Sequence, residues 1–148
     1  YKTFKKTIII NPLKNSLRTD NVFFCATSLV YFFIKYFIKN SKKKINVDLN
    51  KYLFFAAIAT VCDQMPLRNI NKKIVINGFK NFQYNKFVNL KKLLKINHRL
   101  NTSDISFSLG PILNSASRLG YSSLPFSLLI EKNNTIIDRI SNKLKILN

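Results

Sequence analysis

Acidic residues are scarce in this chain. It contains only 6 Asp and Glu residues against 25 Lys and Arg residues, and its formal net charge is +19. Such a balance favours polyanionic partners, namely nucleic acid or an anionic membrane surface. Tryptophan is absent while Lys, Asn, Ile and Phe are abundant, which is also the composition that an AT-rich coding bias produces. The charge therefore indicates the class of partner only weakly.

Cysteine is rare as well. Cys25 and Cys62 stand in apolar runs, and neither belongs to a CxxC pair or a Cys/His cluster of the kind that binds zinc. Free, buried thiols in a reducing compartment are the expected state. No pattern of a secretory signal opens the sequence, so we expect a cytoplasmic protein. At 148 residues, 47% of them hydrophobic, the chain is long enough for one domain with a substantial core.

Long, uninterrupted apolar runs are missing too. Residues 22–38 could mimic a membrane span, but Lys35 interrupts them before they reach the roughly 20 residues that a span needs. Leu29, Phe33 and Phe37 recur at helical spacing. We therefore expect a mostly buried helix here and no membrane segment.

One strand and several helices are predicted from the residue patterns. Residues 6–10 form a β-branched run that ends at Asn11-Pro12, because a proline lacks an N–H and keeps the residue before it out of the helical region. Asp48 is the expected N-cap of the helix that follows it. Gly110-Pro111 is expected to break or kink a helix. The predicted helices span residues 22–39, 49–62, 71–80, 90–95, 102–109 (capped by Thr102 or Ser103), 124–130 and 135–147.

The predicted strand has no predicted partner in the chain. A strand needs neighbours to satisfy the N–H and C=O groups along its edges. The chain also begins at Tyr1 rather than at Met, shortly before that strand. We therefore expect a part of a longer fold, mostly helical here, with one strand of an incomplete sheet.

Asp63 is the first candidate functional residue. It lies near the end of the apolar run Leu53–Leu67, where it is solvated, caps a helix or holds a cation. Metals that activate water in phosphodiester hydrolysis need several oxygen ligands, and the other acids show no ligand spacing. On spacing alone, a helix-terminal cap or a salt-bridge partner is the commoner role of such an Asp. His98, alone in a basic stretch, is more simply a structural or solvent-facing residue.

The small, polar segment Asn114–Gly120 is the second candidate. Its small side chains expose backbone donors, and Arg118 offers a bidentate fork for a phosphate. Gly120 permits a left-handed turn. Taken alone, this composition is also that of an ordinary loop.

The order of these pieces resembles that of a known family. The RecJ family of single-strand-specific exonucleases, in the DHH phosphoesterase superfamily, shows V-N-P, then A-L-G-T-x-A-D-V-V-P-L, then G-P-x-x-N-A-x-G-R-x-G. Here INP, AIATVCDQMPL and GPILNSASRLG follow one another in the same order. The matching residues are Asn11, Pro12, Ala57, Thr60, Asp63, Pro66, Leu67, Asn71, Gly78, Gly110, Pro111, Asn114, Arg118 and Gly120.

The resemblance implies a fold, a cofactor and a substrate. Residues 1–100 would be the C-terminal part of a DHH-type α/β/α domain, and residues 101–148 its end and a helical connector toward a second domain. The family binds Mn²⁺ or Mg²⁺ and degrades single-stranded DNA from the 5′ end, in DNA repair and recombination. Its last metal-ligand Asp falls on Asp63, which would be catalytic. Arg118 would contact a DNA phosphate, and Asn114 would order the loop.

Several departures from the family pattern leave alternatives open. The upstream D-x-D and D-H-H motifs and the downstream glycine- and histidine-rich motif are absent from the chain, so we expect it to be inactive by itself. Ser115 and Ser117 replace small Ala and Gly positions, and a serine where positive φ is required would strain the backbone. One alternative is a basic, non-enzymatic nucleic-acid-binding module, supported by the charge and the interleaved aromatics. The other is a DHH phosphoesterase that acts on small nucleotides.

Overall fold

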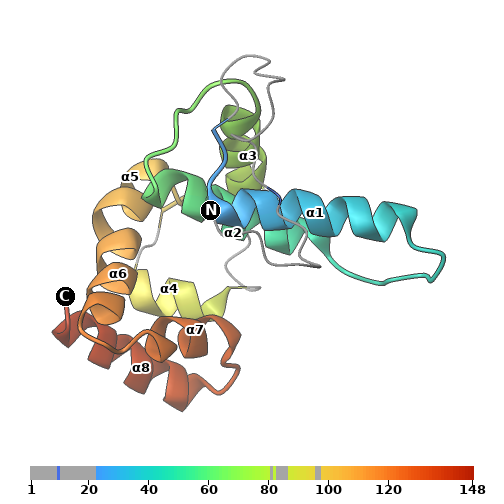
Figure 1. Cartoon of the computed structure of the whole chain (residues 1–148). Coiled ribbons are helices and arrows are strands. Elements are labelled where there is room, and N and C mark those ends of the chain that lie inside the picture. The colour runs from blue at the N-terminus through green and yellow to red at the C-terminus, as the bar shows by residue number, and fades with distance from the viewer. Residues whose placement is uncertain (1–9, 11–22, 81, 83–86, 96–97) are drawn as a thin grey trace, which may run out of the picture.

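The described part of the protein is built from helices. The structure is a computed structural model, and it describes residues 10, 23–80, 82, 87–95 and 98–148. The elements, shown in Figure 1, are α1 (Ala26–Asn40), α2 (Leu49–Cys62), α3 (Asn69–Lys80), α4 (Val88–Leu94), α5 (Thr102–Asp104), the π-helical η1 (Ile105–Leu109), α6 (Gly110–Arg118), α7 (Ser123–Ile130) and α8 (Asn134–Ile146).

The predicted α/β class is therefore wrong for the described residues, which contain helices and no strand. Within the predicted strand only Ile10 is described, and it is exposed and belongs to no element. The rest of that strand, together with Asn11-Pro12, lies outside the described residues. A sheet needs a hydrogen-bonded partner strand, and the described residues supply none. The division of the chain near residue 100 stays a prediction.

Helix α2 lies at the centre of the fold, where it packs against α1, α3 and η1. Its N-cap is Asp48, as predicted, and the Asp48 carboxylate accepts a hydrogen bond from the Asn50 N–H (3.1 Å). Gly78 of α3 allows a close crossing, because a Cβ added there would lie 2.5 Å from the Ala57 Cβ. The buried residues of α2 are Phe54, Ala56, Ala57, Ile58, Thr60 and Val61.

A small polar cluster joins α1 to α2 inside the core. The Thr60 hydroxyl donates to the Ala56 carbonyl (2.7 Å) and lies 3.2 Å from the Ser28 hydroxyl, which in turn lies 3.2 Å from the Cys25 Sγ. Thr60 and Ser28 are fully buried. Because buried hydroxyls are costly without partners, this mutual bonding fixes the position of α1 on α2. Cys25 is a buried free thiol, as predicted.

Helix α1 is less buried than predicted. Only Ser28 and Tyr31 are buried, while Val30, Phe33 and Phe37 are more than half exposed. The apolar spacing was correctly interpreted as helical, but the helix contacts α2 along one side and leaves other apolar positions uncovered. None of the described helices combines the length and the hydrophobicity required to cross a bilayer.

The second half of the chain folds against the end of the first. Helix α4 packs on α7 and α8, and α6 packs on α7 and α8, below α2 in the view of Figure 1. The Asn89 side chain donates to the Leu128 and Leu129 carbonyls (2.7 and 3.0 Å), so it caps the C-terminal part of α7. The larger of two hydrophobic clusters among the described residues runs through both halves, and a smaller one lies between α1, α2 and α3. The fully buried large residues of the larger cluster include Phe54, Leu90, Leu93, Ile105, Leu109, Leu128, Ile137 and Leu144.

Residues 102–118 form one continuous helix, so of the break or kink predicted at Gly110-Pro111 the break does not occur. The helix begins at a capping box, in which the side chains of Asn101 and Asp104 each accept the other's backbone N–H. A proline inside an α-helix clashes with the carbonyl four residues before it. Residues 105–109 relieve this by winding as a π-helix, in which the Gly110 N–H donates to the Ile105 carbonyl five residues back.

Candidate nucleic-acid interface

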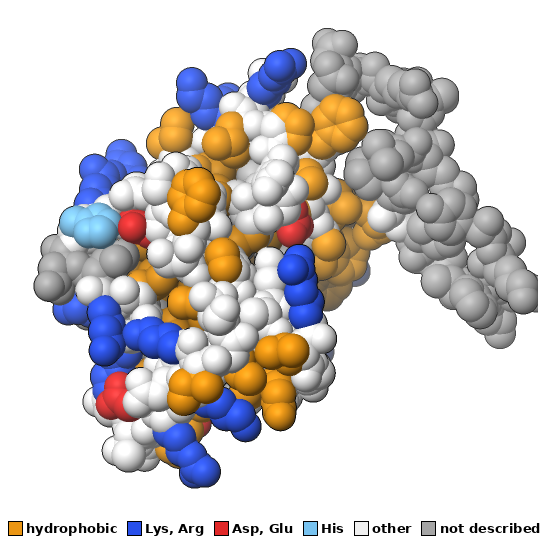
Figure 2. Space-filling view, turned by 90° about the vertical axis from the view of Figure 1, so that its left-hand side faces the viewer, with side chains coloured by type: hydrophobic (Ala, Val, Ile, Leu, Met, Phe, Trp, Pro, Cys, Tyr) orange, Lys and Arg blue, Asp and Glu red, His pale blue; other side chains and the backbone are white. Residues whose placement is uncertain are grey.

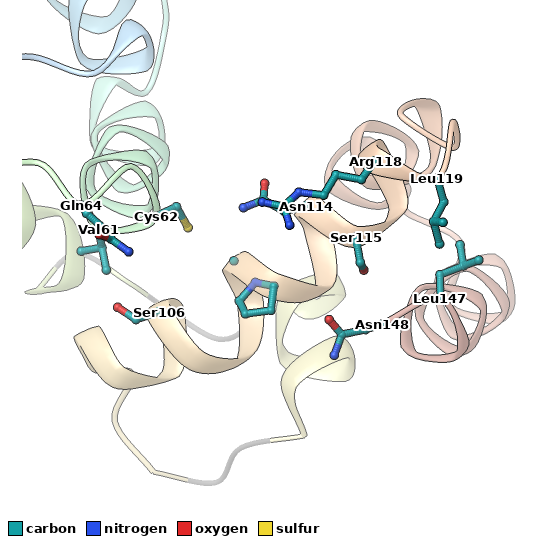
Figure 3. Close-up of a pocket in the computed structure, with 12 residues that line it drawn as sticks. Val61, Cys62, Gln64, Ser106, Asn114, Ser115, Arg118, Leu119, Leu147 and Asn148 are labelled. Carbon is teal, nitrogen blue, oxygen red and sulfur yellow. The ribbon is translucent and has the colours of Figure 1, made fainter.

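The two sequence motifs meet at one pocket. The C-terminal end of α2 and the helix η1–α6 enclose a hollow of about 660 Å³, shown in Figure 3. From α2 and the residues after it come Val61, Cys62 and Gln64, and from η1 and α6 come Ser106, Gly110, Pro111, Asn114, Ser115 and Arg118. Leu119, Leu147 and Asn148 complete the lining. Segments some fifty residues apart in the chain therefore share one site.

Helix α2 ends in a tight turn that shapes one side of the pocket. The N–H groups of Gln64 and Met65 donate to the carbonyls of Val61 (3.1 Å) and Thr60 (3.0 Å), as in a Schellman motif. Gln64 has a φ of +52°, which is unusual for a residue with a side chain. The turn directs the chain toward Pro66 and leaves the Gln64 side chain at the pocket.

Asp63 is the C-cap residue of α2 and is exposed. Its backbone N–H donates to the Ala59 and Val61 carbonyls, and no hydrogen bond or ion pair of its carboxylate occurs among the described residues. A carboxylate at the negative end of a helix dipole is mildly unfavourable for stability. Asp63 adjoins the pocket through its neighbours Cys62 and Gln64, although it is not one of the lining residues.

Asp63 does not by itself make a metal site. Mn²⁺ and Mg²⁺ require several oxygen ligands. Within the part of the chain that the structure describes, no three His, Cys, Asp or Glu residues lie close enough together to hold a metal ion. The assignment of Asp63 as a ligand stays a prediction, and any further ligands would have to come from outside the described residues.

Asn114 and Arg118 project from α6 toward the pocket. They are four residues apart, so they lie on one face of the helix, and Figure 3 shows both side chains reaching into the space across from Cys62. Both are exposed and thus accessible to a ligand. The predicted loop is wrong here, because residues 114–118 are helical. Gly120, just beyond the end, was the signal of a helix that the sequence analysis missed.

The end of α6 confirms the role predicted for Gly120. Its φ is +85°, and the N–H groups of Gly120 and Tyr121 donate to the carbonyls of Ser117 (3.2 Å) and Ala116 (2.8 Å). The left-handed position is thus occupied by glycine, whereas Ser117 lies inside α6 and has no positive φ. The Ser117 hydroxyl bonds back to the Leu113 carbonyl (3.4 Å). The expected strain at a serine does not occur at that position.

Gly110 brings the two sides of the pocket together. A Cβ added to it would lie 3.0 Å from the Cys62 Sγ and 3.1 Å from the Ile105 carbonyl oxygen, so a side chain here would press on both sides of the pocket. Burial, followed by the adjacent Asp63 carboxylate, raises the pKa of the Cys62 thiol. Cys62 is free and half-buried, and it is held as the neutral thiol rather than as a nucleophilic thiolate.

His98 takes no part in the pocket. Its Nε2 lies 3.0 Å from an Asp104 carboxylate oxygen, and its side chain is about half exposed. Asp104 also caps the helix that begins at Thr102. The interpretation of His98 as a structural or solvent-facing residue is therefore confirmed. Gln64 and Ser106 were not foreseen as pocket residues, because their positions depend on the αL turn and on the π-helical winding of η1.

Comparison with known proteins found two curated relatives. No protein-family model matches the chain. The single-stranded-DNA-specific exonuclease RecJ of Escherichia coli (strain K12) is 33% identical over 106 residues, which are 68% of this chain and 18% of that protein. RecJ of Salmonella typhimurium is 35% identical over 88 residues, which are 56% of this chain and 15% of that protein. The chain thus spans less than a fifth of the length of these relatives. Over the matched residues, the chain is related to the RecJ single-stranded-DNA-specific exonucleases.

Proposed function

We propose that this chain provides part of the strand-binding surface of a metal-dependent exonuclease that digests single-stranded DNA from its 5′ end, in DNA repair and recombination. The observation that supports this most is the convergence of the two motif segments on one pocket that contains Arg118. Two relatives whose names specify exonuclease action on single-stranded DNA support the same substrate.

Arg118 is the proposed phosphate contact. A guanidinium forms paired, charge-assisted hydrogen bonds with a phosphate and cannot lose its charge near neutral pH. Asn114 lies one helical turn before it and offers an amide donor to the same ligand. The surroundings are favourable for a polyanion, since the chain carries a net charge of +19. On the face in Figure 2, Lys and Arg side chains are spread over several parts of the surface and acidic side chains are few.

Asp63 is the proposed link to catalysis. In phosphodiester hydrolysis, bound Mn²⁺ or Mg²⁺ supplies an activated water and neutralises charge on the phosphate. The exposed carboxylate of Asp63, beside the pocket and without a structural partner among the described residues, is suited to one position in such a centre. One carboxylate is too few for the whole centre, so the chain alone is expected to bind single strands and not to cleave them.

Substitution of Arg118 tests the phosphate contact. Arg118→Ala should weaken binding of a labelled oligothymidine about 10-fold, because a hydrogen bond to a charged group contributes about 1.5 kcal/mol. It should also lower the slope of log affinity against log salt concentration by about one. Arg139→Ala, which removes an exposed arginine of α8 outside the pocket, is the matched control. Equal losses in the two variants, measured by fluorescence anisotropy, would contradict a specific role for Arg118.

Substitution of Asp63 tests the metal assignment. In a protein of the relatives' length that contains this segment, Asp63→Asn should abolish Mn²⁺-dependent cleavage of 5′-phosphorylated single strands. Its free energy of unfolding should change by less than about 1 kcal/mol, because the side chain is exposed. Cleavage that persists in the Asn variant would remove Asp63 from the metal centre.

A basic, non-enzymatic binding module is the second candidate. The charge of +19 and exposed aromatic residues such as Tyr36 favour it, although Tyr31 and Phe87, which belong to the same aromatic series, are buried. Such a module would bind single strands without cleaving them, and Asp63→Asn would leave its binding unchanged. The Asp63→Asn experiment therefore separates the two functions. Activity on short oligonucleotides or small nucleotides alone would indicate a small-nucleotide phosphoesterase. A cytoplasmic location stays a prediction.

A further inference from the structure

A second hollow lies at the other end of α2. It has a volume of about 640 Å³ and is formed by the first turns of α2, the start of α4, and the region where α7 passes into α8. None of its lining residues belongs to the motifs that resemble RecJ. We call it the α2–α7 groove, and its exposed lining residues include Lys51, Tyr52, Phe126, Ile130 and Lys132.

The floor of the groove is firmly packed. Phe87 is buried, and its ring meets that of Phe55 edge-on with the centroids 5.8 Å apart. Asn89 ties the start of α4 to the carbonyls of Leu128 and Leu129 in α7. Because the floor residues are held by the core, the groove keeps its shape without a ligand.

Aromatic and aliphatic surfaces in the groove remain open to water. Tyr52 of α2 is 45% exposed and Phe126 of α7 is 63% exposed, although both line a concave site. Exposed apolar surface that is gathered in a hollow marks a binding site more often than scattered exposed residues do. Planar rings in such a place offer stacking surfaces for another planar group.

The charges in the groove favour an anionic ligand. Lys51 and Lys132 are exposed, and Glu131 is the acidic residue among the lining residues that the structure describes. The Glu131 Oε1 accepts the backbone N–H groups of Lys132 (2.7 Å) and Asn133 (2.8 Å), so this oxygen is already engaged in the turn between α7 and α8. Two flexible cations beside open aromatic rings are the combination that binds single-stranded nucleic acid.

We propose that the α2–α7 groove binds nucleobases of single-stranded DNA, with bases stacked on Tyr52 and Phe126 and phosphates paired with Lys51 and Lys132. The choice of DNA rather than another anion rests on the proposed function. The groove is a site separate from the Arg118 pocket, because the two share no lining residue. It recognises bases, whereas the pocket recognises phosphate.

The test compares a normal strand with one that lacks bases. The probe is a fluorescein-labelled oligothymidine of about 12 nucleotides, within the known range for single-strand binding folds, and a matched abasic strand. Tyr52→Ala and Phe126→Ala should each weaken oligothymidine binding by about fivefold or more, and should leave abasic-strand binding within about twofold. Arg118→Ala should weaken both. Lys51→Gln should lower the salt slope by about one, whereas Lys39→Gln, an exposed lysine of α1, should not.

Matched controls make the outcome decisive. Phe107→Ala removes a ring that is 82% exposed on η1, outside both the groove and the pocket, and should change neither affinity. Helical content and thermal unfolding show whether each variant is folded. Unchanged oligothymidine binding in Tyr52→Ala and Phe126→Ala would overturn the groove proposal, even where Arg118→Ala weakens binding. Equal losses on both strands would also overturn it, since stacking would then have no part.

Two further results have definite meanings. Loss in the groove variants with no effect of Arg118→Ala would leave the groove proposal standing and remove the proposed phosphate site. Binding of the apolar dye ANS that the groove variants abolish, together with unchanged DNA binding, would assign the groove to an apolar protein segment instead and overturn the proposal.

Discussion

The two ends of α2 face hollows of similar size and different chemistry. At the C-terminal end, Cys62 and Gln64 meet Asn114 and Arg118 around a pocket of about 660 Å³. At the N-terminal end, Lys51 and Tyr52 border a groove of about 640 Å³ that also contains Phe126. Volume alone therefore does not distinguish the two sites. The side chains that would orient a ligand distinguish them: Arg118 and Asn114 predict a phosphate in the pocket, whereas Tyr52 and Phe126 predict a base in the groove.

The two sites also differ in how they relate to the sequence. The pocket is built from residues of the two recognisable motifs, including Gly110, Asn114 and Arg118. The groove is built from residues without a motif, several of which also support the core, such as Phe55 and Phe87. Motifs thus revealed one end of α2, and only the packed structure revealed the other.

Substitution of Phe54, near the groove end of α2, should have the largest effect on stability. Its ring is fully buried and lies 4.6 Å, centroid to centroid, from the rings of Phe82 and Phe87. Phe54→Ala should lower the free energy of unfolding by about 3–5 kcal/mol, measured by urea denaturation. Phe126→Ala, at an exposed ring of the groove itself, should lower it by less than about 1 kcal/mol. Similar losses in both variants would show that the groove wall, and not only its floor, supports the fold.

A methyl group at Gly110, at the pocket end of α2, should have the next largest effect on stability. Gly110→Ala forces a Cβ against the Cys62 Sγ and the Ile105 carbonyl, and should cost about 1–3 kcal/mol. In a double-mutant cycle with Cys62→Ala, part of that loss should disappear, because the sulfur is removed while the carbonyl stays. Ser117→Ala, at an exposed position of α6, should change stability by no more than about 0.5 kcal/mol. Strictly additive losses would show that the Gly110–Cys62 approach does not set the width of the pocket.

The smallest expected effect concerns pH and the turn beside the groove. Hydrogen bonds from the Asn133 and Lys132 N–H groups lower the pKa of Glu131. A carboxylate whose pKa is lower in the folded state stabilises the fold above its unfolded pKa and loses that contribution as pH falls through the folded value. Glu131→Gln should therefore lower the melting temperature slightly at pH 7, and the difference from the parent protein should shrink in strongly acidic buffer. A difference that grows on acidification would contradict this sign.

Much of the secondary structure followed from local patterns. The helix 49–62 and its Asp48 cap were predicted with the observed bounds, and the predicted helices near residues 71–80, 124–130 and 135–147 are α3, α7 and α8. The fold class was wrong for the described residues, which form helices alone. Of the break or kink predicted at Gly110-Pro111, the break was wrong, because the π-helical turn before it accommodates the proline.

The candidate site likewise contains residues that the sequence predicted and residues that only the structure revealed. Arg118 and Asn114 were singled out from the sequence, and the structure brings them to one pocket with the end of the Asp63 segment. The roles of all three residues stay predictions. The pocket residues Gln64 and Ser106 had no recognisable signal, since one depends on a left-handed turn and the other on the winding of η1.

Spacing, capping residues and charge along the chain were sufficient to locate most of the helices, to single out the exceptional residues and to indicate an anionic partner. These effects act within a few residues or on the chain as a whole. Packing alone decided that the helix of residues 102–118 continues through Gly110-Pro111, that α1 leaves apolar residues uncovered, and that two separate hollows open at the ends of α2. Those outcomes depend on contacts between segments far apart in the chain, such as Gly110 against Cys62 and Asn89 against α7, which no local pattern encodes.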